Sequence, residues 1–232
     1  MARNKLLRLS SSIVFGAILV SIVAGVLHPD REPANNHPAV FAEYAASDLW
    51  TLVHFGQFVG MAGIVAGLIL MSFAFEESAE TSSWWNRLAR MAAIVALALY
   101  GVLQAVDGVA LKQAVNAWAA APEAEKLARL ASAESIRWLE WGARSYQSFM
   151  FGLSLVLFAV VIVLKAPVPK FVGYIMGLSG AAYLYQAWVV GAEGFSMRNH
   201  LPTLLGIIQV VAWSISLLVV SWRTARTPHR PM

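Results

Sequence analysis

The stretch Arg137-Trp-Leu-Glu140-Trp-Gly-Ala-Arg144-Ser-Tyr-Gln147 runs without a break into the apolar segment 148–164. At about 100° per residue of an α-helix, its charged and amide side chains fall within a sector of roughly 80°. One helix therefore carries a polar stripe directly into a hydrophobic slab. Because an ionised side chain near the centre of a bilayer costs on the order of 3 kcal/mol, this stripe must face protein or water and not lipid.

The composition is that of a multi-pass membrane protein. Hydrophobic residues make up 59% of the 232 residues and charged residues only 13%, and the mean hydropathy is +0.63. Soluble domains have about 25% charged residues. The absence of cysteine excludes disulfides, thiolate metal sites and a cysteine nucleophile. The net charge is +4, but the basic residues form no patch interleaved with aromatics, so we expect no nucleic-acid partner.

Six apolar segments predict an all-α integral membrane bundle that forms a single domain over 1–232. The predicted transmembrane helices are 9–27, 49–74, 88–119, 133–164, 171–193 and 201–222. Short amphipathic segments at about 39–46 and 122–130 are expected to lie outside the membrane. No convincing cleavage site precedes His28, so we expect the first apolar run to be a retained anchor and not a signal peptide.

The distribution of Lys and Arg predicts the orientation of these helices. Ten basic residues fall in segments that six spans place on one side: Arg3, Lys5, Arg8, Arg87, Arg90, Lys165, Lys170, Arg223, Arg226 and Arg230. Only Arg31, Lys126, Arg129 and Arg198 fall on the other side. Because short cytoplasmic segments are enriched in basic residues, both termini are expected in the cytoplasm.

Two pairs of helices share short polar patterns. His54-x-x-Gln57 resembles Arg144-x-x-Gln147 in spacing, and Tyr100 and Tyr183 each precede a Gln-Ala pair by a few residues. Because the orientation is the same in each pair, the pattern predicts a tandem hairpin repeat, 49–119 and 133–193.

The polar residues of the predicted helices gather in their outer halves. At 1.5 Å per residue, His54, Glu140 and Arg144 fall about 8–14 Å below the outer helix ends, and Asp107 about 18–22 Å below, near mid-membrane. The inner halves have almost no ionisable residue. This asymmetry predicts a cavity that opens to the extracytoplasmic side and is closed by apolar packing on the cytoplasmic side.

Individual residues of this polar layer have both functional and structural interpretations. Asp107 has no basic residue three or four positions away, so we expect Arg144 as its partner. Arg144 and Glu140 are equally consistent with a structural ion pair within one helix. His54 is a candidate general base, because imidazole titrates near neutral pH, although a lone histidine in a membrane helix more often bonds to another helix.

The candidate ligand-binding residues are Arg144, Lys112, Gln104, Gln57, Gln147, Gln186, Glu193, Trp141 and Tyr183. The glutamines are as consistent with interhelical hydrogen bonds, and the aromatic residues with plain packing. His54 has no second histidine at matched depth for a haem, and His54, Asp107 and Glu140 lack the spacing of a zinc site. We therefore expect no metal and no cofactor.

Three segments carry a family resemblance: 99–112, 137–147 and Gly191-Ala-Glu193-Gly-Phe-Ser196. With them the chain resembles a group of uncharacterised bacterial multi-pass membrane proteins classed as a domain of unknown function. The resemblance covers most of the chain from residue 49 onward. It implies a six-helix protein of the bacterial cytoplasmic (inner) membrane and no particular activity.

Three functional hypotheses follow. The first is that the protein binds or transports a small amphiphilic or anionic molecule in an outward-facing intramembrane pocket. Arg144 and Lys112 would bind the anionic group of that molecule, and membrane lipid would surround the protein. The second is an intramembrane enzyme acting on a lipid or isoprenoid, with Asp107 or Glu140 as the general acid and His54 as the base. The third is a structural membrane subunit without a ligand.

Overall fold

The computed structural model describes residues 2–29, 31–76 and 80–223, with the side chains at 2, 80–83 and 165 left out. Most of the described residues are helical and none lies in a strand, which confirms the all-α class. The helices are α1 (Ala2–Leu27), α2 (His37–Ala45), α3 (Trp50–Phe75), α4 (Glu80–Gln104), the π-helix η2 (Ala105–Leu111), α5 (Lys112–Ala119), α6 (Glu123–Lys165), α7 (Lys170–Glu193) and α8 (Met197–Arg223).

Five stretches within these helices are long and apolar enough to cross a membrane. They are Arg3–Leu27, Trp50–Phe75, Trp84–Ala119, Glu123–Leu164 and Met197–Arg223. α7 has 24 residues, which is long enough to cross, but it is not among these five stretches. A multi-span membrane architecture is therefore supported, and the sixth span stays a prediction, as does the tandem hairpin repeat.

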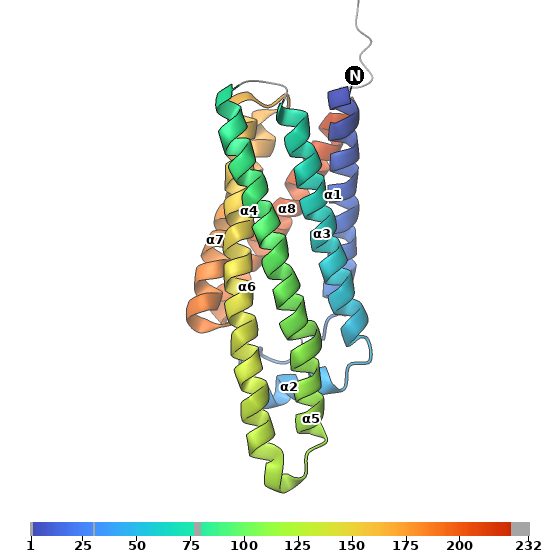
Figure 1. The fold of residues 1–232 in the computed structure, drawn as a ribbon, viewed down its shortest axis with the longest axis vertical. Coiled ribbons are helices and arrows are strands. Elements are labelled where there is room, and N and C mark those ends of the chain that lie inside the picture. The colour runs from blue at the N-terminus through green and yellow to red at the C-terminus, as the bar shows by residue number, and fades with distance from the viewer. Residues whose placement is uncertain (1, 30, 77–79, 224–232) are drawn as a thin grey trace, which may run out of the picture.

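The long helices form a ring. α1 packs on α3, α3 on α4, α4 on α6, α6 on α7, α7 on α8, and α8 returns to α1. Figure 1 shows them running up and down along one axis. The start of α1 meets the end of α8, where the hydroxyl oxygens of Ser11 and Ser221 lie 2.7 Å apart. We call this the α1 end of the bundle, and the opposite end, where α5 turns into α6, the hairpin end.

Small residues set the closest contacts in this ring. The carbonyl oxygen of Gly67 in α3 accepts a 2.8 Å hydrogen bond from Ser10 in α1. A Cβ atom added at Gly67 would lie 2.4 Å from Val14 Cγ2, and one added at Gly152 in α6 would lie 2.7 Å from the carbonyl oxygen of Gly180 in α7. Such close approach suits membrane helices, because dispersion contacts replace the hydrophobic effect between them.

A large apolar cluster fills the interior toward the α1 end. It joins all the long helices, and its largest fully buried members include Leu68, Met71, Phe75, Phe158, Met176, Trp213 and Leu217. The ring is thus closed by packing at this end, so open space is left mainly toward the hairpin end.

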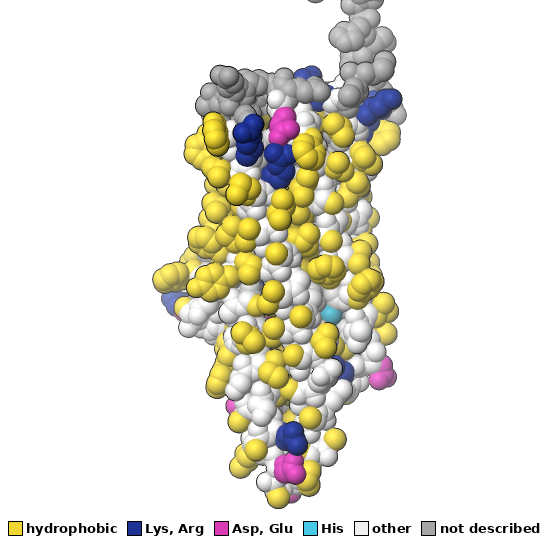
Figure 2. All heavy atoms as spheres, in the orientation of Figure 1, with side chains coloured by type: hydrophobic (Ala, Val, Ile, Leu, Met, Phe, Trp, Pro, Cys, Tyr) yellow, Lys and Arg dark blue, Asp and Glu magenta, His cyan; other side chains and the backbone are white. Residues whose placement is uncertain are grey.

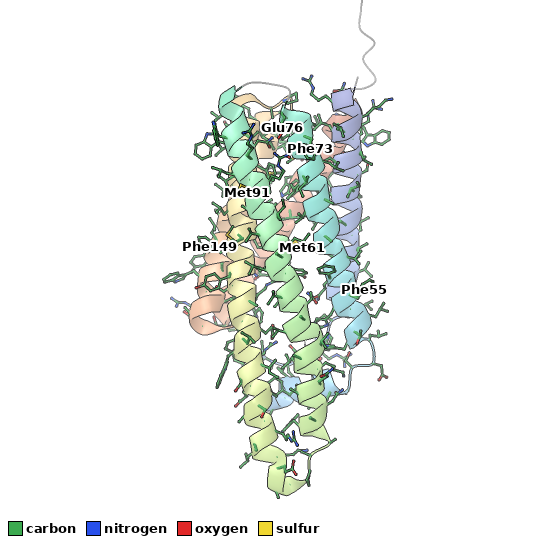
Figure 3. All side chains as sticks on the ribbon, viewed as in Figure 1. Phe55, Met61, Phe73, Glu76, Met91 and Phe149 are labelled. Carbon is green, nitrogen blue, oxygen red and sulfur yellow. The ribbon has the colours of Figure 1, made fainter. Side chains whose placement is uncertain are left out.

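The face of the bundle seen in Figure 2 is largely apolar between the two ends, with charged side chains gathered near the α1 end and at the hairpin tip. Phe55, Phe73, Met91 and Phe149 lie along the outside of the bundle (Figure 3), with between 44% and 64% of each side chain exposed. A continuous apolar surface of this kind is typical of a membrane-facing wall.

α6 corrects one predicted boundary. The sequence predicted a short helix at 122–130 and a separate membrane helix at 133–164, but the structure has one helix of 43 residues. No Pro or Gly interrupts the connecting residues 131–136, so the helix continues. At about 1.5 Å per residue it is roughly twice as long as a 30 Å hydrocarbon core is thick.

Other helix boundaries differ less. α1 begins at Ala2 and not at 9, α4 at Glu80 and not at 88, and α8 at Met197 and not at 201. In each case polar first turns continue the helix beyond its apolar part, which is the only part that hydropathy marks. The amphipathic segment expected at 39–46 is α2, which buries Val40, Phe41 and Tyr44 against α5 and α6.

The length of the hairpin also corrects the predicted depth of Asp107. α5 and the first turns of α6 extend past the ends of α1 and α3 (Figure 1). Depth counted from the end of α5 therefore overestimates depth in the bundle. The indole nitrogen of Trp50, the first residue of α3, donates a 3.1 Å hydrogen bond to the carbonyl oxygen of Gly108. Asp107 thus lies level with the first turn of α3 and not near mid-membrane.

Candidate functional site

Asp107 lies within the π-helix η2, which interrupts the regular α-helical hydrogen bonding between α4 and α5. The Trp50 indole N–H points at the backbone carbonyl oxygens of Asp107 and Gly108, at 3.3 and 3.1 Å. A π segment inserted in an α-helix is frequent at functional sites, because it turns one side chain out of the normal helical register.

His54 is the partner of Asp107. His54 Nε2 lies 3.1 Å from Asp107 Oδ2, and only 3% and 13% of the two side chains are exposed. His54 Nδ1 lies 2.8 Å from the Trp50 carbonyl oxygen, which can only accept, so Nδ1 carries a proton. The expected pairing of Asp107 with Arg144 is wrong, because α3 and not α6 presents the nearest basic group.

Gly108 makes this pairing sterically feasible. A Cβ atom at position 108 would lie 2.9 Å from His54 Cβ and 3.2 Å from His54 Cγ. The missing side chain therefore lets the imidazole pack directly against the backbone of η2, beside Asp107. The Trp50 ring stacks on the other side, with its centroid 4.2 Å from that of His54.

A second buried ion pair joins Arg137 and Glu140 within α6. Arg137 Nη1 lies 2.5 Å from Glu140 Oε2, and both side chains are 3% exposed. The Arg137 guanidinium also lies over the rings of Phe195 and Tyr44, at 5.2 and 5.4 Å. The alternative that Glu140 pairs with Arg144 is therefore wrong, because Glu140 pairs with the preceding turn of its own helix.

A polar cavity of about 620 Å³ opens among the helices at the hairpin end. The acidic residues of the two ion pairs, Asp107 and Glu140, line this cavity together with histidine, amide and hydroxyl groups. Its lining residues are Gly25, His28, Ala34, Tyr44, Gln57, Leu103, Gln104, Asp107, Arg137, Glu140, Arg144, Gln186, Phe195, Asn199, His200, Thr203, Leu204 and Ile207. The cavity lies at the hairpin end of the bundle, and that this end faces away from the cytoplasm stays a prediction.

A second, mostly apolar cavity of about 470 Å³ adjoins the first. Its walls come from α1, α3, α4, α6, α7 and α8 and consist mainly of aliphatic and aromatic side chains. Its lining residues are Ile18, Ser21, Ile22, Gly25, Val26, Gln57, Met61, Ile64, Tyr100, Arg144, Gln147, Phe151, Tyr183, Ile207, Val210 and Val211. Gly25, Gln57, Arg144 and Ile207 belong to both cavities.

Arg144 stands at the junction of the two cavities without a carboxylate partner. Among the described residues no ion pair within 4 Å includes Arg144, and its Nε atom is buried without a hydrogen bond. The phenol groups of Tyr100 and Tyr183 interact electrostatically with it from the wall of the apolar cavity. A buried guanidinium in this setting is suited to receive an anionic group.

Several other polar atoms around the polar cavity also lack partners among the described residues. They are Gln104 Oε1, Asp107 Oδ1, Gln186 Oε1 and Asn199 Oδ1. Buried polar groups in folded proteins are nearly always hydrogen-bonded. A cluster of unpaired ones along one cavity therefore indicates that water or a ligand completes their hydrogen bonding.

The glutamines form hydrogen bonds between helices and also line the cavities, which are the two roles that the sequence predicted as alternatives. Gln104 donates to Gln57 Oε1 at 3.3 Å and joins α4 to α3, and Gln186 donates to Thr203 Oγ1 at 2.9 Å and joins α7 to α8. These three also line the polar cavity, and Gln147 and Tyr183 line the apolar one. Interhelical bonding and cavity lining thus occur in the same side chains.

Three candidate ligand-binding residues are engaged elsewhere. Lys112 Nζ donates to the carbonyl oxygens of Tyr44, Ala45 and Ser47, at 2.6 to 3.0 Å, and so caps the end of α2. Glu193 accepts hydrogen bonds from Ser196 and Arg198 in the turn to α8. Trp141 packs against His37 and Phe195 and is not among the residues that line either cavity.

His28 and Arg137 are cavity residues that the sequence did not predict as site residues. His28 follows the last residue of α1, and the signal for it was a titratable side chain placed directly at the end of an apolar run. Arg137 belongs to the polar stripe of α6, but its role depends on the aromatic residues of other segments that surround it.

The chain was compared with protein-family models, with curated proteins and with solved structures. None of these comparisons found a significant match.

Proposed function

We propose that this chain is a six-span membrane protein that binds or transports a small amphiphilic anion, with its acidic group at Arg144 and its apolar tail in the adjoining cavity. The observation that carries the proposal is the position of Arg144 in the walls of both the polar and the apolar cavity. A molecule with one anionic end and one apolar end matches that junction.

The charge balance of the polar cavity supports an anionic ligand. Its two carboxylates both have basic partners, Asp107 with His54 and Glu140 with Arg137. Arg144 has no carboxylate within 4 Å among the described residues, although Glu140, one turn earlier, and the phenols of Tyr100 and Tyr183 act on it electrostatically. An anionic ligand would give its guanidinium a direct partner. An anion would also gain from hydrogen-bond donors nearby, because charge-assisted hydrogen bonds are about twice as strong as neutral ones.

The sizes of the cavities support a small molecule of this kind. Volumes of about 620 and 470 Å³ lie within the usual range of roughly 300–1,000 Å³ for ligand pockets. The second cavity is lined mainly by aliphatic side chains, including Ile18, Ile22 and Val211. A short acyl or isoprenoid chain is the type of group that such a wall binds.

The distribution of basic residues supports an outward-facing site. Arg3, Lys5 and Arg8 start α1, and Arg87 and Arg90 lie near the start of α4, all at the α1 end. By the positive-inside rule this end is cytoplasmic, and the cavities at the hairpin end then open to the other side of a bacterial cytoplasmic membrane. Arg226 and Arg230 lie outside the described residues.

The geometry favours binding over acid–base catalysis. The candidate acids Asp107 and Glu140 are each held in an ion pair, and His54 is bonded through Nδ1 to a backbone carbonyl. A purely structural polar layer is less favoured. In such a layer side-chain pairs would include Arg144 and fill the space between the helices, whereas Arg144 has no ion-pair partner within 4 Å among the described residues and two cavities remain.

The test is binding of cis-parinaric acid, an apolar carboxylate, to the full chain in lipid nanodiscs, read by energy transfer from the protein's tryptophans to the probe after subtraction of the signal from empty nanodiscs. Arg144→Gln should weaken binding by about 10- to 150-fold, the equivalent of a charged hydrogen bond worth about 1.5–3 kcal/mol. The methyl ester of the same acid should bind the parent as weakly as the acid binds the variant. Arg129→Gln is the matched control, because Arg129 pairs with Glu125 on the exposed hairpin.

A second variant tests the cavity junction without removing a charge. Gly25 lines both cavities, and a Cβ atom there would meet no atom within 4 Å. Gly25→Leu should therefore fill the junction and reduce binding, whereas Gly16→Leu, equally open on α1 but outside both cavities, should not. Unchanged affinity in both Arg144→Gln and Gly25→Leu would overturn the proposal.

A further inference from the structure

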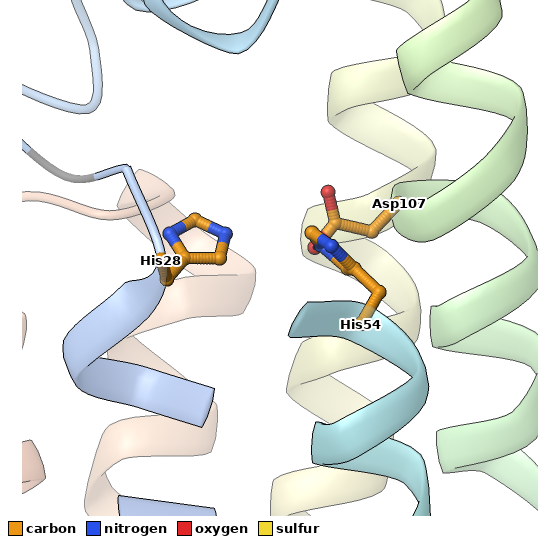
Figure 4. A group of neighbouring side chains, drawn as sticks. All are labelled: His28, His54 and Asp107. Carbon is orange, nitrogen blue, oxygen red and sulfur yellow. The ribbon is translucent and has the colours of Figure 1, made fainter. Parts of the chain in front are cut away.

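Three potential metal ligands from distant parts of the sequence meet in the wall of the polar cavity. His28 comes from the end of α1, His54 from the second turn of α3 and Asp107 from η2 (Figure 4). One ligand atom from each residue lies within 4.8 Å of the ligand atoms of the other two. Among the described residues this is the group of His and carboxylate side chains that is close enough to hold one ion.

We propose that His28, His54 and Asp107 bind a divalent transition-metal ion, of which Zn²⁺ is the best-fitting example. Ligands at about 2.0–2.2 Å from a tetrahedral zinc ion lie roughly 3.3 Å from one another. The 3.1 Å distance between His54 Nε2 and Asp107 Oδ2 matches this spacing. Closing His28 around the ion from 4.8 Å requires a shift of at most about 1.5 Å.

The orientation of His54 suits a metal ligand. Its Nδ1 proton points to the Trp50 carbonyl oxygen at 2.8 Å, so in the neutral imidazole the lone pair is on Nε2, which faces Asp107. Metal-binding histidines almost always make such a bond through their other nitrogen, because it fixes both the tautomer and the ring. Trp50 is itself buried and stacks on the imidazole, which holds the ring further.

His28 belongs to the same packed group of rings. Its ring centroid lies 5.3 Å from that of His54 and 5.4 Å from that of Trp50. His28 follows the last residue of α1, and its side chain is partly exposed to the polar cavity. It is thus placed to adjust to an ion without disturbing a helix.

The ligand types select the ion. Two imidazoles and one carboxylate suit zinc, iron, cobalt and similar ions, whereas magnesium and calcium prefer oxygen ligands alone. Three protein ligands leave at least one coordination position, and His28 and Asp107 both border the polar cavity. Water or a ligand in the cavity would fill that position.

The expectation from the sequence was the opposite, because no two of these residues have the short spacing of a known zinc motif. His28, His54 and Asp107 are 26 and 53 positions apart. The proposal goes beyond amphiphile binding, and it is measured without any amphiphile. Failure of metal binding would therefore leave the proposed function standing, and the reverse also holds.

The test is equilibrium dialysis of the full chain, purified in detergent, freed of its affinity tag and treated with a chelator, against Zn²⁺. One Zn²⁺ per chain is expected, with Co²⁺ giving visible absorption bands of a nitrogen- and oxygen-ligated ion. His28→Gln, His54→Gln and Asp107→Asn should each weaken Zn²⁺ binding by more than about 100-fold, since loss of outer partners alone costs 10- to 100-fold.

His37→Gln is the matched control, because His37 also faces a carboxylate, Glu134 at 3.0 Å, but outside the group of three. It should bind Zn²⁺ like the parent. His28→Gln keeps the test valid if the buried variants misfold, since His28 is at a helix end. Absence of stoichiometric Zn²⁺ binding, parent-like affinity in His28→Gln, or equal binding of Mg²⁺ would overturn the proposal.

Discussion

Arg144 and Glu140 lie one turn apart on α6 but do not pair with each other, because Arg137 holds the Glu140 carboxylate from the preceding turn, at 2.5 Å. The same helix therefore presents two buried arginines with different roles. Arg137 neutralises a buried acid, and Arg144 faces the junction of two cavities. This difference leads to different expected effects of the same substitution.

Arg137→Gln should destabilise the protein far more than Arg144→Gln. Removing Arg137 leaves the Glu140 carboxylate buried without its partner, which costs about 3–5 kcal/mol. Arg144→Gln breaks no ion pair seen among the described residues and should change the free energy of unfolding by less than about 1 kcal/mol. Unfolding in mixed micelles with increasing dodecyl sulfate measures both values.

The double variant Arg137→Met, Glu140→Leu is the control for this prediction. Replacement of a buried ion pair by apolar residues of similar volume is often neutral. The double variant should therefore recover most of the stability lost in Arg137→Gln. Equal stability of the two single arginine variants would show that the ion pair is not the cause.

Gly108→Ala should displace His54. The new Cβ would lie 2.9 Å from His54 Cβ, closer than such atoms approach, so η2 and α3 must move apart. We expect a loss of about 1–3 kcal/mol in the free energy of unfolding, as for overpacked cores. The thermal midpoint of unfolding in detergent reports it.

Gly101→Ala on α4 is the matched substitution for this comparison. Its Cβ would meet Phe58 Cε2 at 3.7 Å, an ordinary contact, and alanine favours the helix. It should leave the midpoint unchanged or raise it. A midpoint lowered equally by both variants would contradict the contact with His54 as the cause.

Lys112→Met should loosen α2. The ammonium group donates to three carbonyl oxygens at and after the end of α2, and each such charged hydrogen bond contributes about 1.5–3 kcal/mol. Hydrogen exchange read by mass spectrometry should show faster exchange in residues 37–48 and little change in α7. Lys126→Met, which removes a single exposed bond to Ala119, should leave the exchange of α2 unchanged.

Gly152→Ala should separate α6 from α7. A Cβ at position 152 would lie 2.7 Å from the Gly180 carbonyl oxygen and 3.0 Å from the Leu184 nitrogen, so backbone and not a flexible side chain must move. A loss of at least about 2 kcal/mol in the free energy of unfolding is expected. Gly142→Ala, with no atom within 4 Å on the same helix, should instead stabilise by up to about 1 kcal/mol.

Much of the helical framework could be predicted from the sequence, since apolar runs, prolines and charged ends are local signals. The predicted helices at 49–74 and 171–193 lie within one residue of α3 and α7. The break expected before residue 133 was wrong, because no local signal stops α6 there.

The candidate site could be predicted only in part. Gln57, Gln104, Asp107, Glu140, Arg144 and Gln186 do line one cavity, as a shared polar layer requires. Their partners could not be predicted, because those depend on how far each helix is shifted along its neighbour. The overhang of α5 and α6 brings Asp107 to the first turn of α3, where it meets His54 and not Arg144.

The sequence by itself determined that this chain is a bundle of apolar helices with its polar residues gathered toward one end, because hydropathy and helical period act within each segment. The tertiary structure alone decided which charges cancel. It paired Glu140 with Arg137 and Asp107 with His54, brought His28 beside them, and left Arg144 between two cavities. These outcomes depend on the axial offsets of helices and on glycine contacts between them, which are properties of the packed ring and not of any one segment.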